Sequence, residues 1–150
     1  MTDAKEVFAC ITPAIAKFMP WDPPKWSEYV ARCEKRVQAP EPNHFYFVIR
    51  RLDNRECLGM ASLEDAGSVS PELGLWLKES AHGQGFGSEV VNALVEYGHT
   101  TLGKESFIYP VAVQNTVSRR IAENLHGEII GSRKNPKYDS VVYRIPFYKR

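Results

Sequence analysis

The sequence predicts a mixed α/β fold of the α+β class, with a mostly antiparallel sheet flanked by helices. Three observations support this. Hydrophobic spacing is helical up to about residue 38 and strand-like from residue 45 onward. The third strand-like run leads through a glycine-rich turn into a long amphipathic helix. A further strand, helix and strand pair follow. We expect residues 1–150 to form a single domain, because 43% of the residues are hydrophobic, enough for one core.

The first third of the chain has helical spacing. Thr12 followed by Pro13 is the pattern of an N-cap residue and a first helical position. The residues Trp26, Tyr29, Val30, Cys33 and Val37 recur at the spacing of one helix face. We therefore expect helices from Thr2 or Asp3 to about residue 11, over 14–19 and over 25–38.

Six strand-like runs follow, and two more helices lie between them. The last position of the longer helix precedes Gly103, a residue type typical of the position just past a helix end. Short polar or glycine-containing segments separate the runs, as between strands. The expected strands cover residues 45–49, 57–63, 72–77, 107–112, 128–131 and 140–147, and the expected helices cover 85–102 and 118–125.

Bulk properties exclude several classes of protein. A net charge of +1 argues against a general nucleic-acid binder. No apolar run approaches the ~20 residues of a membrane span, and the N-terminus lacks a signal-peptide pattern. The three cysteines, Cys10, Cys33 and Cys57, lack metal-type spacing. We expect a cytoplasmic protein with reduced thiols, no bound metal and no membrane or nucleic-acid partner.

The glycine-rich turn His82-Gly83-Gln84-Gly85-Phe86-Gly87 joins the strand over 72–77 to the helix over 85–102. Glycines there let the backbone approach a ligand, and the helix adds the positive end of its dipole, which suits a pyrophosphate. A P-loop is excluded because Gly87 is followed by Ser88-Glu89 and not by Lys-Ser/Thr. The glycine spacing also differs from a Rossmann fingerprint. A tight turn without a ligand is the alternative.

A second motif, Asn115-Thr116-Val117-Ser118, starts a helix just after the strand over 107–112. Simple N-capping would explain it, because Asn and Ser are favoured there. Both motifs, however, would follow the C-terminal ends of neighbouring parallel strands, which is where ligands bind in such sheets.

With these motifs in this order, the chain resembles the GNAT superfamily of acyl-CoA-dependent N-acetyltransferases. The family pattern Arg/Gln-x-x-Gly-x-Gly/Ala is matched by residues 82–87 except at the first position. The Asn-x-x-Ser motif and the run Glu72-Leu73-Gly74-Leu75-Trp76-Leu77 resemble the branch that acetylates ribosomal-protein N-termini and related amines (RimJ/RimL-like), as does Met19-Pro20-Trp21. The similarity runs from about Asp3 to Phe147.

The resemblance implies acetyl-CoA as co-substrate and a gap between two splayed parallel strands that admits its pantetheine arm. The implied cofactor-binding residues are Trp76, Leu77, Lys78, His82, Gly83, Gln84, Gly85, Phe86, Gly87, Ser88 and Asn115. Pro110 supports the gap independently, because a proline removes a ladder donor and is tolerated where no partner would accept that bond. An ordinary bulge is the alternative for Pro110.

For catalysis, the resemblance implies Glu72 as the general base, with Glu64 and Asp65 as runner-up bases. A backbone N–H between Leu75 and Leu77 would stabilise the oxyanion. Many family members protonate the leaving thiolate with a tyrosine, but Ala122 stands at the matching position here. We expect Ser118 to substitute for it by hydrogen-bonding to the sulfur. The structural alternative for Glu72 is a solvated carboxylate at a strand end. The structural alternative for Ser118 is a serine that only caps the helix.

By analogy with the family, we expect the pocket for the acceptor amine to be lined by Trp21, Trp26 and Tyr143. Helical spacing also allows Trp26 to be a core residue. The sequence does not choose between a protein N-terminus and a small amine. We expect an N-acetyltransferase that works by direct attack in a ternary complex. The alternatives are a non-catalytic acyl-CoA-binding sensor and, more weakly, an assembly scaffold.

Two departures from the family pattern affect these expectations. His82 replaces an arginine or glutamine and loses arginine's fixed charge, which predicts weaker or pH-sensitive acetyl-CoA binding. The usual first strand is also missing from the sequence. The strand over 45–49 should then be an open sheet edge, unless a second copy in a homodimer or the C-terminal strand covers it.

Overall fold

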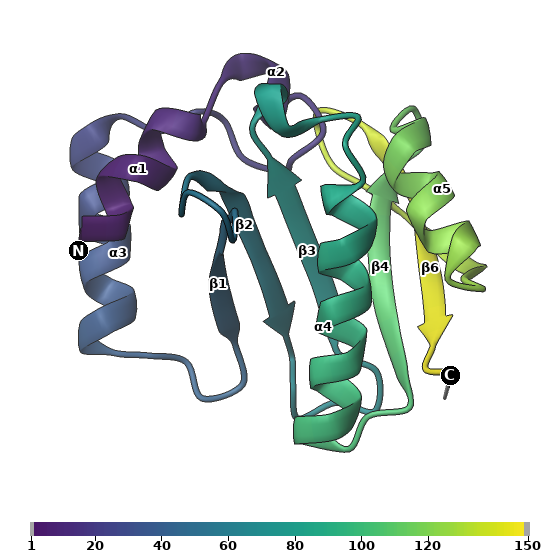
Figure 1. Ribbon diagram of the computed structural model, residues 1–150. Coiled ribbons are helices and arrows are strands. Elements are labelled where there is room, and N and C mark those ends of the chain that lie inside the picture. The colour runs from purple at the N-terminus through teal and green to yellow at the C-terminus, as the bar shows by residue number, and fades with distance from the viewer. Residues whose placement is uncertain (1, 149–150) are drawn as a thin grey trace.

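The computed structural model describes residues 2–148 and shows one six-stranded mixed sheet with helices on both faces (Figure 1). The strand order is β1-β2-β3-β4-β6-β5. The strands are β1 (Phe45–Arg50), β2 (Cys57–Glu64), β3 (Glu72–Leu77), β4 (Ser106–Ala112), β5 (Glu128–Lys134) and β6 (Asp139–Pro146). The helices are α1 (Thr2–Cys10), α2 (Pro13–Ala16), α3 (Trp26–Gln38), η1 (Glu79–Ala81), α4 (Phe86–Leu102) and α5 (Thr116–Asn124). The predicted fold class is confirmed.

Helix ends lie where local sequence signals predict them. The side chain of Thr12 caps α2 by accepting a hydrogen bond from the Ile15 amide at 3.3 Å. The long helix α4 runs between two glycines in the left-handed region, Gly85 with φ +82° and Gly103 with φ +69°. Asn115 caps α5 through the Ser118 amide at 3.2 Å. These ends depend on neighbouring residues alone, which is why the sequence predicts them.

Helix α2 ends at Ala16 and not at residue 19, and α5 begins at Thr116 and not at residue 118. Two further elements differ more from the expected pattern. The short 3-10 helix η1, between β3 and the glycine turn, was not predicted, because a single turn leaves no periodicity to detect. Strand β5 extends three residues beyond the expected end at 131, since Ser132, Arg133 and Lys134 continue the antiparallel ladder with β6. All seven residues of β5 are exposed, so burial could not produce an alternating pattern there.

The parallel strands β3 and β4 meet at only one register position, Glu72 opposite Ile108, next to a 2.8 Å hydrogen bond from the Ile108 amide to the Pro71 carbonyl. Beyond this point the two strands diverge. Pro110 pairs with Val142 on β6 without a register shift, so the bulge alternative is excluded. Because backbone groups of alternate residues face the same side, the nitrogen of Pro110 faces β3, as that of Ile108 does. Pro110 therefore lies beside the splay, as predicted.

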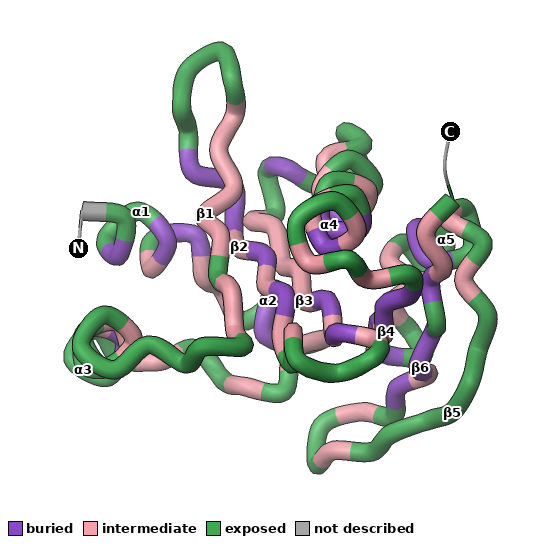
Figure 2. The backbone as a smooth tube through the Cα atoms, turned by 90° about the horizontal axis from the view of Figure 1, so that it is seen from below, coloured by how far each residue is buried: buried purple, intermediate pink, exposed green. Residues whose placement is uncertain are grey.

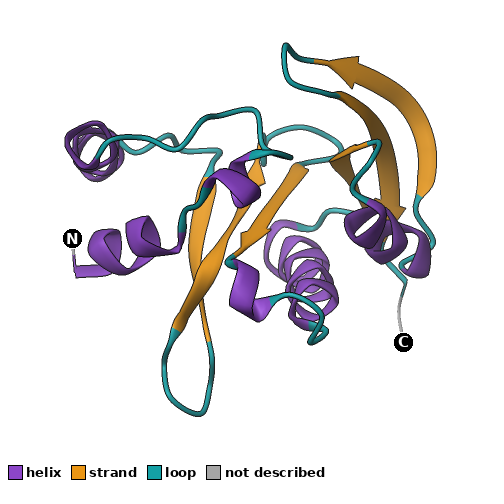
Figure 3. Ribbon diagram, turned by 90° about the horizontal axis from the view of Figure 1, so that it is seen from above, coloured by secondary structure: helices purple, strands orange, loops and turns teal. Residues whose placement is uncertain are grey.

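The main core lies between the sheet and the helices α4 and α5. Gly98 of α4 allows the close approach, since a Cβ there would lie 2.3 Å from the ring of Phe107. A second apolar cluster joins α1, α3 and β2. Figures 2 and 3 show α4 and α5 on one face of the sheet, while α3 and the curved β5–β6 hairpin rise on the other. The face between α3 and the hairpin is therefore left open for a site.

Strand β1 is one edge of the sheet, as predicted. Its last residue, Arg50, binds the carboxylates of Asp3 and Glu6 and so fastens α1 to this end of the sheet. Within residues 2–148, no helix combines the length and apolar composition needed to cross a membrane.

Candidate active site

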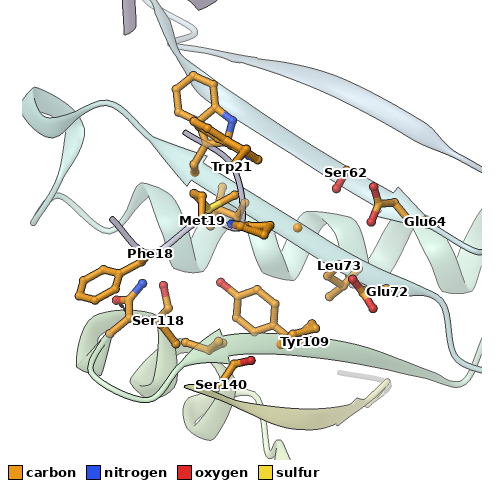
Figure 4. Close-up of a pocket in the computed structure, with 18 of the residues that line it drawn as sticks. Phe18, Met19, Trp21, Ser62, Glu64, Glu72, Leu73, Tyr109, Ser118 and Ser140 are labelled. Atoms are coloured by element: carbon orange, nitrogen blue, oxygen red, sulfur yellow. Dashed lines mark hydrogen bonds between the residues drawn. The ribbon is translucent and has the colours of Figure 1, made fainter. Parts of the chain in front are cut away.

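A cleft of ≈ 480 Å³ opens over the splay between β3 and β4 (Figure 4). Its walls come from five parts of the chain: the segment after α2, helix α3, strands β1 to β4, the start of α5 and the β5–β6 hairpin. The lining residues include Trp21, Arg36, Glu64, Glu72, Leu75, Trp76, Tyr109, Pro110, Asn115, Ser118, Arg133, Lys134 and Tyr138.

The main chain of β3 presents hydrogen-bonding groups to this cleft. The Lys78 amide donates to the Leu58 carbonyl of β2 at 2.7 Å. In an antiparallel ladder such bonds recur at every second residue, so the backbone groups of Trp76 face β2 and those of Leu75 and Leu77 face the gap. The amides of Leu75 and Leu77 are therefore the donors available for an oxyanion or a pantetheine carbonyl, and Trp76 contributes its side chain.

The glycine turn leaves room for a ligand. Gly83 (φ +75°) and Gly85 (φ +82°) have left-handed backbones, and a Cβ on either would meet nothing within 4 Å. Gly85 caps α4 without a side-chain hydrogen bond, so the first amides of the helix are open to an anion. Gly87 differs, because its Cβ would lie 2.9 Å from Cδ1 of Ile121 in α5. Gly83 and Gly85 thus fit a pyrophosphate, whereas Gly87 allows close helix packing.

The polar side chains beside this turn form hydrogen bonds and ion pairs with other residues of the chain. Nε2 of His82 lies 2.7 Å from the Leu77 carbonyl oxygen, and the Gln84 amide donates to the Ser80 carbonyl at 2.8 Å. Nζ of Lys78 pairs with Glu56 at 2.6 Å. The imidazole of His82 therefore ties the turn back to the end of β3.

Two carboxylates, Glu64 and Glu72, lie opposite each other on β2 and β3 and line the cleft (Figure 4). Glu72 forms a 2.7 Å ion pair with Arg133 of β5. The imidazole of His44 lies beside Glu64, with Nδ1 4.0 Å from its carboxylate. Burial raises the pKa of Glu64, and the charge of Glu72 raises it further. Asp65 lies outside the cleft lining, near His44.

The start of α5 brings Asn115 and Ser118 to the cleft, as expected. The Asn115 side chain caps the helix, and Ser118 lines the cleft together with Tyr109 of β4 (Figure 4). Burial raises the pKa of Tyr109. Sequence reasoning missed Tyr109. The available signal was its position directly before Pro110 in a strand expected to border the gap.

The expected acceptor-site residues divide into two groups. Trp21 lines the cleft and packs edge-on against Trp76, with ring centroids 6.1 Å apart. Trp26 instead packs edge-on against Phe8 of α1, with ring centroids 5.2 Å apart, and its side chain is exposed, so it is not the core residue that helical spacing also allowed. Tyr143 is 1% exposed, and its hydroxyl donates to Glu123 of α5 at 2.9 Å. Neither Trp26 nor Tyr143 lines the cleft, so the structure brings only Trp21 to the site.

A lysine of the β5–β6 hairpin holds the Trp21 segment in place. Nζ of Lys137 donates to the carbonyls of Ala16 at 2.6 Å and Trp21 at 2.9 Å, and lies 3.1 Å from the Asp22 carboxylate. These contacts join residues more than 110 positions apart. No sequence pattern reveals them, because both sides depend on tertiary packing.

Comparison with known proteins agrees with this geometry. A family model described as an acetyltransferase (GNAT) domain matches residues 1–128. The structure is similar to an acetyltransferase (GNAT family) from Bacillus anthracis, with a TM-score of 0.83 at 18% identity over 97% of this chain and 89% of that chain. It is also similar to spermidine N-acetyltransferase from Vibrio cholerae in complex with CoA and spermine. That match has a TM-score of 0.80 at 18% identity over 95% of this chain and 88% of that chain.

Proposed function

The chain belongs to the GNAT acetyltransferase family, and from this premise we propose that it acetylates a primary amine by direct attack on acetyl-CoA in a ternary complex. One observation carries the proposal. The gap that opens beyond the Glu72–Ile108 pair exposes Leu75 to the cleft, and the backbone of Leu77 faces the same gap at the end of the strand. The same strand leads through η1 to the open glycine turn, so a thioester arm and its pyrophosphate have adjoining places.

The proposed acetyl-CoA site uses mainly backbone groups. The pyrophosphate would be held by the amides of residues 82–88 at the start of α4, where Gly83 and Gly85 leave space. The pantetheine arm would lie along β3 beside Leu75, Leu77 and the side chain of Trp76. Asn115 would anchor the facing loop by capping α5. Acetyl-CoA supplies the activated acyl group.

For the base, we propose Glu64 ahead of Glu72. An amine must lose a proton to become a nucleophile, and a carboxylate with a raised pKa accepts it more readily. Glu72 is held in its ion pair with Arg133, whereas Glu64 is free of so close a partner. Glu64 would take the proton directly or through one water, and an amide of Leu75 or Leu77 would donate to the developing oxyanion.

The lining of the cleft supports an acceptor with a single amine. Its charged side chains are Arg36, Glu64, Glu72, Arg133 and Lys134, so cations and anions are mixed. A polyamine would need several carboxylates for its several ammonium groups. We therefore propose a protein N-terminus or a small monoamine, in line with the RimJ/RimL-like branch. Residues 1–150 would act as one catalytic domain.

The second candidate function is an acyl-CoA-binding sensor. One observation favours this sensor function. Many family members have a tyrosine that acts as the general acid, but the matching residue here is Ala122, which is fully buried and has no hydroxyl. This candidate predicts tight acetyl-CoA binding without turnover.

One experiment separates the two candidates. Acetyl-CoA binding is measured by calorimetry, and thiol release is measured with peptides of different N-terminal residues, with small monoamines and with spermidine. We expect binding and amine-dependent thiol release, fastest with a peptide or monoamine. Binding without release on any amine would favour the sensor. An absence of binding would exclude both.

A further inference from the structure

A tyrosine in the splay has no assigned part in the reaction. Tyr109 is 3% exposed, and Figure 4 shows its side chain directed from β4 into the cleft, toward Ser118. It directly precedes Pro110, whose nitrogen faces the gap. A buried hydroxyl at the point where two strands separate lies beside the path proposed above for the thioester arm.

We propose that Tyr109 donates a hydrogen bond to the sulfur of CoA as the thiolate departs, and that Ser118 is a positioning residue for Tyr109. The inference rests on the proposed function, because it places the thioester in the gap between β3 and β4. In this proposal the leaving thiolate is stabilised by Tyr109 of β4, whereas the sequence had suggested Ser118 alone for that role.

The surroundings of Ser118 explain how it would position the phenol. The Ser118 amide donates to the Asn115 side chain at 3.2 Å, which fixes the first turn of α5. Ser118 and Tyr109 line the same cleft, and Figure 4 shows the phenol of Tyr109 pointing toward Ser118. A hydrogen bond donated by Ser118 to the phenol oxygen would make the phenol a better donor toward a third atom, because hydrogen bonds in a chain polarise one another.

The reaction balances without a proton leaving Tyr109. The new C–N bond forms, the C–S bond breaks, and the electron pair of that bond goes to the sulfur. The amine proton goes to Glu64 and then to solvent. Because burial raises the pKa of Tyr109, its phenol stays protonated at neutral pH and acts as a donor. CoA departs as a thiolate and is protonated by solvent.

The packing of α5 explains why the hydroxyl comes from β4. Ala122 is fully buried in the main core together with Ile121 and Tyr143. A tyrosine ring at position 122 would overfill that core. The cleft therefore receives its phenol from β4, the strand that precedes α5.

The first test measures the acidity of the CoA thiol in its complex with the protein, using the ultraviolet absorbance of the thiolate. This readout needs no acceptor amine. We expect Tyr109→Phe to lower the acidity constant of the bound thiol about tenfold or more, as for the loss of one hydrogen bond to a charged group. Tyr138→Phe is the matched control, because Tyr138 also lines the cleft but lies at the β5–β6 turn. It should leave the acidity unchanged.

The second test measures turnover. Tyr109→Phe should lower kcat about tenfold or more with little change in KM for acetyl-CoA. Ser118→Ala should lower kcat less, and it should add nothing in the Tyr109→Phe background. Circular dichroism and CoA affinity check that each variant is folded. Since the phenol keeps its proton, the pH profile of kcat should have the same shape at high pH in the wild type and in Tyr109→Phe.

Each outcome bears on the inference. If Tyr109→Phe leaves both the thiol acidity and kcat within twofold of wild type, the inference is wrong. A basic limb lost in Tyr109→Phe would show proton transfer and overturn the hydrogen-bond mechanism. If the wild type releases no thiol with any amine, the proposed function fails, and the thiol titration still decides whether Tyr109 contacts the sulfur.

Discussion

The two sides of the cleft are built in different ways. The proposed acetyl-CoA side comes from one continuous segment, β3 through α4, and works through backbone groups and two left-handed glycines. The proposed acceptor side is assembled from distant segments through side chains, such as Arg133 with Glu72 and Lys137 with Trp21. On the first side, a change in the backbone should therefore reduce acetyl-CoA affinity more than a side-chain truncation such as His82→Ala, and the second side should be sensitive to single side-chain substitutions.

Removing the proposed base should have the largest effect on the acceptor side. We expect Glu64→Gln to lower kcat by about 10²-fold or more, the usual range for a general base. Glu72→Gln is the matched control on the adjacent strand and should cost less. In the wild type, kcat/KM should rise with pH along an acidic limb centred above the usual glutamate pKa. An equal loss in both variants would contradict the choice of Glu64.

The raised pKa of Glu64 also predicts how the stability of the folded protein depends on pH. Since its folded-state pKa is raised, the folded protein binds more protons than the unfolded chain just above the ordinary glutamate pKa. Stability should fall as pH rises through that window. Glu64→Gln should therefore be at least as stable as wild type at neutral pH, measured by thermal unfolding, so that lost activity reflects chemistry.

A change in the glycine turn should have the next largest effect, and only on the acetyl-CoA side. Gly85→Ala places a Cβ on a left-handed residue, at a cost of about 1–2 kcal/mol, and fills space proposed for the pyrophosphate. We expect about tenfold weaker acetyl-CoA binding by calorimetry. Gly103→Ala, at the other end of α4, carries the same backbone strain and should reduce stability without changing affinity. Equal affinity losses would point to helix stability as the cause.

Releasing the Trp21 segment should affect acceptor binding alone. Lys137→Ala removes the donor to the Ala16 and Trp21 carbonyls, and we expect KM for the amine to rise several-fold with acetyl-CoA affinity unchanged. Asp22→Asn is the matched control, because it removes only the exposed ion pair of Lys137, and such pairs contribute little. A larger effect of Asp22→Asn would show that charge, and not the carbonyl contacts, holds the segment.

The smallest effect should come from His82. Because its ring contacts the Leu77 carbonyl, His82→Ala should weaken acetyl-CoA binding only a few-fold by loosening the turn. His82→Gln retains an N–H donor and should recover most of the affinity. If His82→Arg instead binds acetyl-CoA far more tightly than wild type, the missing charge matters more than the carbonyl contact.

Much of the fold could be predicted because its signals are local. The start of α2 and both ends of α4 follow from Thr12, Gly85 and Gly103, and every predicted strand is present. Pro110 indicated the splay, because proline is tolerated in a central strand only where a donor is not needed. The exceptions are η1, too short to show a period, and the end of β5, which lacks a buried face.

Local signals in the amino-acid order are thus enough to predict the GNAT-like fold, the glycine turn and the strand that borders the gap, since these depend on backbone conformation and on residues close in the chain. The packing of the whole chain selects which side chains share the cleft. It paired Glu72 with Arg133, 61 positions away, and left Glu64 freer. It also packed Trp26 against Phe8 of α1 and brought Tyr109 and Ser118 into the same cleft. Contacts between distant segments depend on how the whole chain packs, and no local pattern encodes them.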